Sequence, residues 1–388
     1  MNKLSFHILF LFCFCFTLNG CSSTSLFTLH DIPKPNGSHA VGTRQFDWTN
    51  ENLKDQFSPD STKNRRIMVQ FWYPGILNES DVPFLYCDNP IIIDELSREY
   101  KIPAKFLNEA LHVKTNSYSN LQPLIGKTKY PLIIFSHGKG GYKSQNTVQF
   151  EELASNGYVV LSVDHSYDAV ITVFSDSTIA SYVSDDVKKV GDPVLADKIT
   201  QKKLSARVSD IKFVMDKIWD DYRSIPLFRI IDTSKVGMFG HSFGAATTVL
   251  SSQLDTRIDV SAGLDGWFVP LSDNHLKNGL KIPFLHIGRK SWGLFSNNYQ
   301  KMEKLMNNSQ AKQAHYAVKR MQHFDFMDGS QSASLAIKLV LPHMSVYNKQ
   351  KIKNVLNKML LVYFDSNLKG DNSVSVEMVS RELKTIVD

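Results

Sequence analysis

Hydrophobic residues along this chain gather in short runs that are separated by longer polar or helical stretches. Several of these runs are apolar enough to form strands buried on both faces of a sheet. They cover residues 130–136, 235–239, 258–264, 282–288 and 314–318. Between them, apolar positions recur at helical spacing, as over residues 206–219. Strands that alternate with helices predict an α/β fold, with a mostly parallel central sheet and helices on both faces.

A serine lies between one of these strands and the helix expected after it. The strand 235–239 runs into Gly-His-Ser-Phe-Gly at 240–244, and small or apolar residues follow at 245–250. In a nucleophile elbow the serine sits on a sharp, strained turn, and flanking glycines are needed because a Cβ would strike the neighbouring elements. The alternative is a serine that merely occupies a glycine-rich turn. The strand before it and the helix after it favour Ser242 as a nucleophile.

In a sheet of this kind, an acid and then a histidine follow the nucleophile along the chain. Asp265 lies directly after the strand 258–264, at the edge where open α/β sheets bind ligands. No carboxylate follows the strand 282–288 before Glu303, which lies within a helical pattern. Asp265 is therefore predicted to be the acid. The alternative is an aspartate that caps the next turn.

The general base is expected on the loop after the last strand, 314–318. His323 lies there, whereas His286 and His315 lie within strands and are expected to be core or face residues. The main rival, His343, follows a proline near the end of a helical segment, with no strand to hold it. His323 is therefore predicted to be the base, and the alternative is a histidine on a surface loop.

The strand 130–136 is followed by the glycine-rich loop His-Gly-Lys-Gly-Gly at 137–141. Enzymes with a nucleophile elbow take one oxyanion donor from such a loop and the other from the residue after the nucleophile. The backbone N–H groups of Lys139 and Phe243 are therefore the predicted donors. A phosphate-binding loop is the rival interpretation, but the pattern G-x-x-x-x-G-K-[ST] is absent.

Together these parts predict acyl transfer through a covalent acyl-enzyme, with the histidine as general base and the aspartate fixing its tautomer. Such a reaction needs no cofactor. The sequence also lacks H-E-x-x-H, paired cysteine motifs and an EF-hand loop, so no metal site is expected.

Three segments carry a resemblance to a known family: Ser-His-Gly-Lys-Gly-Gly at 136–141, Gly-His-Ser-Phe-Gly-Ala-Ala-Thr at 240–247, and Gly-Leu-Asp-Gly-Trp at 263–267. On these segments the chain resembles the platelet-activating factor acetylhydrolases, specifically the plasma and intracellular type II group and its bacterial relatives. The setting of Asp265 is the most specific point, because the pentapeptide at 240–244 is shared by lipases and esterases at large. The resemblance covers roughly residues 40–365.

The resemblance implies an α/β-hydrolase fold and a calcium-independent serine esterase that removes short or oxidised acyl groups from the sn-2 position of phospholipids. Bacterial members often act on simpler esters, so a general carboxylesterase, thioesterase or polyester hydrolase is the second hypothesis. A hydrolase fold used only for binding is the third. Lys139 stands where the family usually has an apolar residue. Its cation is expected either to favour anionic substrates or to point to solvent.

The N-terminal residues predict a location in the cell envelope. Within residues 1–20, an apolar run follows Lys3. The run is too short for a membrane-spanning helix, and its pattern is typical of a signal peptide. The ending Leu-Asn-Gly-Cys resembles the bacterial lipoprotein box, so Cys21 is predicted to be lipidated. Since no aspartate follows it, the periplasmic face of the outer membrane is the expected location. The alternative is an ordinary secreted protein.

The remaining chain shows no internal repeat and no interdomain linker. Residues 21–38 are expected to be a polar tether, and 39–388 a single domain whose first clear strand covers 65–73. The polar segment around 166–206 is expected to form a cap over the active site. Apolar residues at helical spacing over 349–368 predict a C-terminal helical extension.

Three aromatic residues are candidates for lining an acyl pocket: Trp267, Phe268 and Trp292. The alternative is that they are core aromatics. The formal charge of +6 is mild and spread without long basic runs, which suits an anionic membrane surface better than nucleic acid. The expected partners are therefore a small-molecule or phospholipid ester and the membrane, with no nucleic acid.

Overall fold

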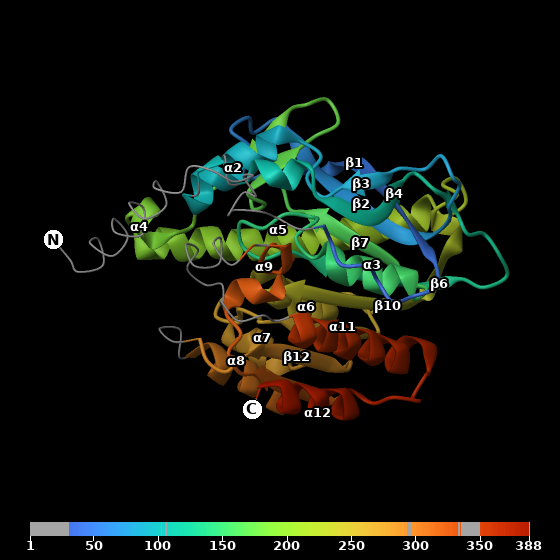
Figure 1. Cartoon of the computed structure of the whole chain (residues 1–388). Coiled ribbons are helices and arrows are strands. Elements are labelled where there is room, and N and C mark those ends of the chain that lie inside the picture. Colours follow the sequence, from blue (N-terminus) through green and yellow to red (C-terminus); the bar gives the residue numbers. More distant parts are fainter. Residues whose placement is uncertain are drawn as a thin grey trace, which may run out of the picture.

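The computed structural model describes residues 31–387 apart from 102, 105–106, 293–296, 333 and 335–349. An eleven-stranded sheet crosses the molecule in the order β13-β12-β11-β10-β6-β7-β2-β1-β4-β3, with β5 paired to β2 (Figure 1). The strands of this sheet are β1 (Ala40–Lys54), β2 (Asn64–Ile76), β3 (Pro83–Leu85), β4 (Lys114–Ser119), β5 (Gln122–Pro123), β6 (Tyr130–Ser136), β7 (Val159–Asp164), β10 (Ile231–His241), β11 (Val260–Leu264), β12 (Phe284–Arg289) and β13 (Gln313–Val318). A separate hairpin pairs β8 (Ile171–Val173) with β9 (Ile179–Ser181).

The strands from β13 to β7 run parallel to one another, and β2 then runs antiparallel to both β7 and β1. The carboxyl ends of the parallel strands therefore meet at one edge of the sheet, where α/β folds place their sites. The predicted α/β class with a mostly parallel sheet is confirmed. Each apolar run proposed as a strand coincides with one: β6, β10, β11, β12 and β13.

Helices cover both faces of the sheet (Figure 1). The longer ones are α2 (Pro90–Tyr100), α3 (Thr147–Ser155), α5 (Pro193–Asp220), α6 (Phe243–Leu254), α8 (Asn297–Asn307), α11 (Gln350–Phe364) and α12 (Val376–Val387). The shorter ones are α4 (Val187–Val190), α7 (Asp273–Asn278) and α9 (Gly329–Ser332), with 3₁₀ turns η2 (Asn108–Leu111), η3 (Phe228–Ile230) and η4 (His323–Phe326) and a π turn η5 (Asp365–Lys369).

Two apolar cores lie on the two faces of the sheet. One joins side chains of α3 and α11 to one face, and the other joins the second half of α5 to the opposite face. Adjacent residues of β6 show the division, because Ile133 packs in the first core and Leu132 in the second. The predicted C-terminal extension is therefore part of the main core, with Met359 and Leu360 buried against the sheet.

Strand β1 precedes the segment 65–73 that sequence patterning marks as the first clear strand. It pairs with β2 from Ala40 to Asn50. Eleven of its fifteen residues are exposed or partly exposed, and Val41 and Trp48 are its buried hydrophobic residues. A strand that buries so few apolar residues has no apolar run for sequence analysis to detect.

The segment predicted as a cap contains the β8–β9 hairpin, α4 and the first half of α5. Helix α4 and the start of α5 extend past the sheet (Figure 1). Helix α5 is twice the length expected from residues 206–219. It begins at Pro193, where the carboxylate of Asp192 accepts hydrogen bonds from the N–H groups of Val194 and Leu195. The boundary predicted at residue 206 therefore falls inside a continuous helix.

The described part of the predicted tether is held against the domain. The backbone N–H of Ile32 donates to the Lys114 carbonyl, and that of Asn36 donates to the Glu152 carboxylate at 3.0 Å. Ile32 is buried. The described end of the predicted tether is therefore bonded to β4 and α3. None of the helices in the described residues has the length and apolar character needed to cross a membrane.

Candidate active site

Ser242 occupies the turn between β10 and α6 with φ 54° and ψ −116°. A positive φ is unfavourable for a residue with a Cβ and costs about 1–3 kcal/mol, so the surrounding structure must hold it. The N–H of Ser242 donates to the Leu264 carbonyl at 3.0 Å, and the Ser242 carbonyl accepts from the Trp267 N–H at 2.9 Å. These bonds fix the strained turn to the end of β11 and to the loop after it.

The two glycines of the pentapeptide are required by close backbone packing. A Cβ on Gly240 would lie 2.2 Å from backbone atoms of Gly244. One on Gly244 would lie 1.9 Å from the Ser136 carbonyl oxygen at the end of β6. The turn therefore has the features of a nucleophile elbow: a strained serine, close approach of strand and helix, and glycine where a side chain would collide.

Ser242, His323 and Asp265 form one chain of hydrogen bonds. The Nδ1 of His323 lies 2.6 Å from Oδ2 of Asp265, and its Nε2 lies 2.9 Å from Oγ of Ser242. Because an ionised carboxylate only accepts, Nδ1 carries the proton and Nε2 is left to accept from the serine hydroxyl. The structure thus brings together the three residues that the sequence predicts as nucleophile, base and acid, in the geometry of a Ser-His-Asp hydrolase.

The acid of this chain is fully buried. Burial by itself raises the pKa of Asp265, but the hydrogen bond from His323 and the charges of His323 and Arg289 lower it below its ordinary value. The Arg289 backbone N–H donates to Oδ1 at 2.9 Å, and its Nε lies 2.9 Å from Oδ2. Asp265 is therefore ionised at neutral pH and held in one orientation. Sequence analysis missed Arg289, which lies at the end of β12.

His241, inside the pentapeptide, packs against His323 and hydrogen-bonds its backbone. Its Nε2–H donates to the His323 carbonyl at 3.2 Å, and its Nδ1 accepts from the Gln145 amide at 3.3 Å. The rings of His241 and His323 lie 4.7 Å apart. Burial, with the charge of His323, lowers the pKa of His241 to about 3, so the supporting ring is neutral.

The glycine-rich loop lies directly against the nucleophile. A Cβ on Gly138 would lie 3.3 Å from the Cβ of Ser242. Phe243 is the first residue of α6, where backbone N–H groups have no partner within their helix. The structure therefore places both predicted oxyanion donors, the N–H groups of Lys139 and Phe243, on segments that adjoin Ser242.

The side chain of Lys139 has a different position from either of the two expected for it. Its Nζ lies 2.8 Å from Oδ1 of Asp185, a carboxylate of the predicted cap segment, and 5.6 Å from the ring centre of Trp267. The cation is therefore paired within the protein, and it neither points freely to solvent nor stands open to an anionic substrate. It ties the oxyanion loop to the cap segment.

The three aromatic pocket candidates separate into two groups. The ring of Trp267 lies tilted against that of Phe243 at 5.3 Å, and Trp292 lies edge-on to the ring of His323 at 5.0 Å, so both adjoin the candidate site. Phe268 is fully buried and packs against Phe284. Phe268 thus fits the alternative of a core aromatic, because it packs in one cluster with Ala246 and Val249 of α6.

A second Ser-His-Asp chain lies behind the oxyanion loop. Ser136 Oγ is 3.0 Å from Nε2 of His165, whose Nδ1 is 2.9 Å from Asp210. All three side chains are buried, with exposed fractions of 1% or less. Ser136 is the last residue of β6 and is not on a strained turn. This chain is a buried support for the loop, and substrate cannot reach its hydroxyl.

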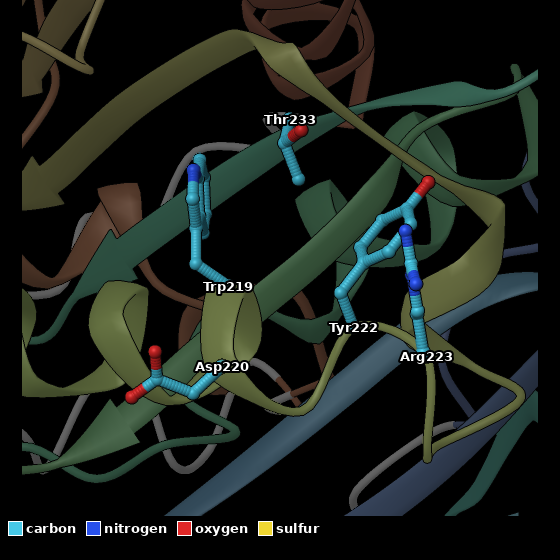
Figure 2. Close-up of a pocket in the computed structure, with 5 residues that line it drawn as sticks. All are labelled: Trp219, Asp220, Tyr222, Arg223 and Thr233. Carbon is cyan, nitrogen blue, oxygen red and sulfur yellow. The ribbon is translucent and has the colours of Figure 1, made fainter.

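A cavity of about 370 Å³ lies at the other end of β10 (Figure 2). Its lining residues are Trp219, Asp220, Tyr222, Arg223 and Thr233. Thr233 precedes Ser242 by nine residues on the same strand, a separation of about 30 Å. This cavity therefore cannot hold a substrate for Ser242. Among the residues that the structure describes, no cluster of three His, Cys, Asp or Glu side chains could hold a metal ion.

The leader, the lipidation candidate Cys21 and the rival histidine His343 lie outside the described residues. The signal peptide and the lipidation remain predictions from the sequence.

Comparison with known proteins decides the family. The model of the family described as platelet-activating factor acetylhydrolase, isoform II, matches residues 25–373. This chain belongs to that family. The platelet-activating factor acetylhydrolase of Cavia porcellus is 26% identical over 88% of this chain and 79% of its own length. Those of Canis lupus familiaris and Gallus gallus are 26% and 27% identical, and the matches span 63% and 53% of their lengths.

A solved structure has the same fold. The ferulic acid esterase from Streptomyces cinnamoneus superposes with a TM-score of 0.70 over 88% of this chain and 94% of its own, at 23% identity. The family resemblance and the α/β-hydrolase fold predicted from sequence motifs are both confirmed. As a member of the acetylhydrolase family, the protein is a carboxylic ester hydrolase.

Four buried histidines make the stability of this acetylhydrolase-family protein dependent on pH. Burial lowers the pKa of His165 to about 4 and of His241 and His286 to about 3, and it lowers that of His137 well below its ordinary value. Below pH ~6.5 the unfolded chain takes up protons that the folded chain refuses, so stability falls as pH falls, by about 1.4 kcal/mol per pH unit for each histidine. Burial raises the pKa of Glu151 to about 7 and raises those of Asp164 and Asp259 above their ordinary values, which opposes part of this trend.

We expect the urea midpoint of unfolding to be highest near neutral pH and to drop steeply between about pH 6.5 and pH 4. Equilibrium unfolding at fixed ionic strength across this range measures it. A midpoint that stays constant or rises on acidification would show that these rings are protonated in the folded state.

Proposed function

We propose that this protein is a serine esterase in which Ser242 is the nucleophile, His323 the general base and Asp265 the residue that fixes the base. The observation that carries the proposal is the hydrogen-bonded chain of these three side chains on a strained turn. Its membership of an esterase family supports the same assignment.

The proposed reaction is a two-step acyl transfer. His323 Nε2 takes the hydroxyl proton as Oγ of Ser242 attacks the ester carbonyl, and the developing oxyanion accepts hydrogen bonds from the N–H groups of Lys139 and Phe243. The imidazolium then protonates the departing alcohol, which leaves an acyl group on Ser242. Water, activated by the same imidazole, releases the acid and restores the serine. Asp265 stays ionised throughout and stabilises the imidazolium.

For the substrate, we propose phospholipids with a short or oxidised sn-2 acyl group. The names of the relatives support this proposal, including a probable 1-alkyl-2-acetylglycerophosphocholine esterase of Arthroderma benhamiae that is 22% identical over 69% of this chain. The alternative is a short-chain carboxylesterase without phospholipid preference. The two Trp side chains beside Ser242 and His323, Trp267 and Trp292, suit an apolar acyl group in either case.

A substrate comparison separates the two. We expect the form that begins after Cys21 to hydrolyse 1-alkyl-2-acetyl phosphatidylcholine with a higher kcat/KM than p-nitrophenyl esters of two- to twelve-carbon acids. The same form with Ser242→Ala gives the background rate. Hydrolysis of the simple esters alone would overturn the phospholipid proposal and leave the esterase proposal standing.

We also propose that Cys21 is lipidated and anchors the enzyme at the periplasmic face of an outer membrane. The resemblance of residues 18–21 to a lipoprotein box supports this proposal. Several acyl chains on one cysteine would make the anchor stable. Fractionation of cells that express the full chain tests it. The wild type should pellet with outer membranes and the Cys21→Ser variant should not, and equal distribution of the two would contradict the proposal.

A further inference from the structure

Arg207 is a fully buried cation of α5 that points at the oxyanion loop. Its Nη1 donates to the His137 carbonyl at 2.5 Å and its Nη2 to the Gly138 carbonyl at 3.2 Å. Its Nε donates to Asp168 at 2.5 Å, which holds the guanidinium in place. Two N–H groups of one guanidinium thus donate to carbonyls of the same loop. Because a guanidinium is rigid and planar, this pair of bonds restricts the orientation of the loop.

The carbonyl of Gly138 belongs to the same peptide group as the N–H of Lys139. A trans peptide is planar, so its C=O and N–H point in opposite directions. The Gly138 carbonyl accepts from Arg207 at 3.2 Å, from Nδ1 of His137 at 2.6 Å and from the Gly141 N–H at 3.0 Å. These three donors together keep the Lys139 N–H pointing to the opposite side of the peptide. That N–H is the predicted first oxyanion donor, and Gly138 lies against the Cβ of Ser242.

The same guanidinium also contacts the residue that supplies the second donor. Its Cζ lies 4.7 Å from the ring centre of Phe243, whose backbone N–H starts α6. Arg207 is thus in contact with both segments of the proposed oxyanion hole. This contact packs the first turn of α6 against the loop and limits movement of one donor relative to the other.

Arg207 belongs to a buried network of paired charges. A cluster of three cations and two carboxylates links α5, the cap segment and the oxyanion loop: Lys139, Lys203, Arg207, Asp168 and Asp185. Lys203 lies 2.9 Å from Asp168 and 3.3 Å from Asp185, and its side chain is fully buried. Through Ser136 and His165 this cluster continues to Asp210, which pairs with Arg65 and, through it, with Asp55. The paired charges therefore hold the Arg207 guanidinium in one position beside the oxyanion loop.

We propose that Arg207 is a positioning residue of the oxyanion hole: with His137 and Gly141 it holds the Gly138 carbonyl and so orients the Lys139 N–H, and it alone of these three also holds the Phe243 ring. The proposal rests on the proposed esterase function. Replacement of Arg207 is therefore expected to lower kcat and to leave KM nearly unchanged, because Arg207 contacts the segments that carry the oxyanion donors and does not contact the substrate.

The test compares Arg207→Lys and Arg207→Met with Arg65→Lys as the matched control. Arg65 is also a buried arginine, and it pairs with Asp55 and Asp210. It reaches the oxyanion loop only indirectly, through Asp210 and His165, and its backbone partner is the Ser166 carbonyl. The measurements are kcat and KM for p-nitrophenyl butyrate, the inhibition constant of a trifluoromethyl ketone that forms a tetrahedral oxyanion adduct, and the thermal midpoint.

For Arg207→Lys we expect kcat to fall on the order of 10²-fold with KM within about threefold, and the ketone to bind more weakly by a similar factor. Arg207→Met should lose more, and Arg65→Lys should lower the thermal midpoint while kcat and ketone binding stay within about threefold of wild type.

A folded Arg207→Lys or Arg207→Met enzyme with wild-type kcat and ketone binding would overturn the proposal. So would a loss that Arg65→Lys reproduces in full, since the role of Arg207 would then be general stability. If Arg207→Met does not fold, the lysine variant decides. Failure of the esterase proposal is distinguishable, because wild-type enzyme would then lack ester hydrolysis or Ser242→Ala would retain it.

Discussion

Replacement of Ser242 by alanine is expected to lower kcat for p-nitrophenyl butyrate on the order of 10⁶-fold, with the fold unchanged. The reason is that the account assigns one nucleophile, 2.9 Å from the only base that contacts it among the described residues. Without Oγ no acyl-enzyme forms, and only the weak catalysis by the oxyanion donors remains. Steady-state kinetics with the circular dichroism spectrum of each protein measures the effect.

Ser136→Ala is the matched control for this experiment. Ser136 also has a histidine at hydrogen-bond distance and an aspartate beyond it, but its side chain is fully buried. Its loss removes hydrogen bonds with His165 and Arg207 and is expected to cost about 1–3 kcal/mol of stability, with kcat reduced far less than in Ser242→Ala. The reverse pattern, with Ser136 essential and Ser242 dispensable, would refute the assignment.

Asp265→Asn is expected to lower kcat by about 10⁴-fold while leaving KM nearly unchanged. An amide can donate as well as accept, so His323 can then carry its proton on Nε2, where it can no longer accept from Ser242. The amide also removes the negative charge that stabilises the imidazolium, and it leaves Arg289 without its carboxylate partner. The pH profile of kcat/KM and the rate at its maximum measure the loss.

A suitable comparison is Asp259→Asn, just before β11, where the carboxylate accepts from the Val236 N–H and is remote from His323 along the sheet. That variant should keep most of the activity. An Asp265→Asn enzyme with activity within about tenfold of wild type would show that another group orients the base.

The central strands and the three side chains at their ends could be predicted from the sequence. Runs such as 130–136 are buried on both faces and so are continuously apolar, which makes them visible without a structure. Ser242 and Asp265 follow two such strands, His323 follows the partly exposed edge strand β13, and topology brings the carboxyl ends of these parallel strands together. The order of elements therefore contained most of the candidate site.

The supporting residues could not be predicted in the same way, because their roles depend on contacts between distant segments. Arg207 binds a loop 69 residues earlier in the chain, and Lys139 pairs with a carboxylate of the cap segment. One signal was present: Lys203, Arg207 and Asp210 fall on the buried stripe of α5 with Leu204 and Ile211. Charged residues on an apolar stripe are costly unless paired, so they indicate a buried network.

The most direct test of the central claim is the intact mass of the enzyme, quenched in acid during turnover of p-nitrophenyl acetate, followed by peptide mapping. The account predicts one acetyl group per chain, located on Ser242, and absent both from Ser242→Ala and from wild type quenched after substrate is exhausted. Two results would contradict this assignment. One is an acetyl group on another residue that forms before product appears, and the other is steady turnover by both wild type and Ser242→Ala with no adduct on either.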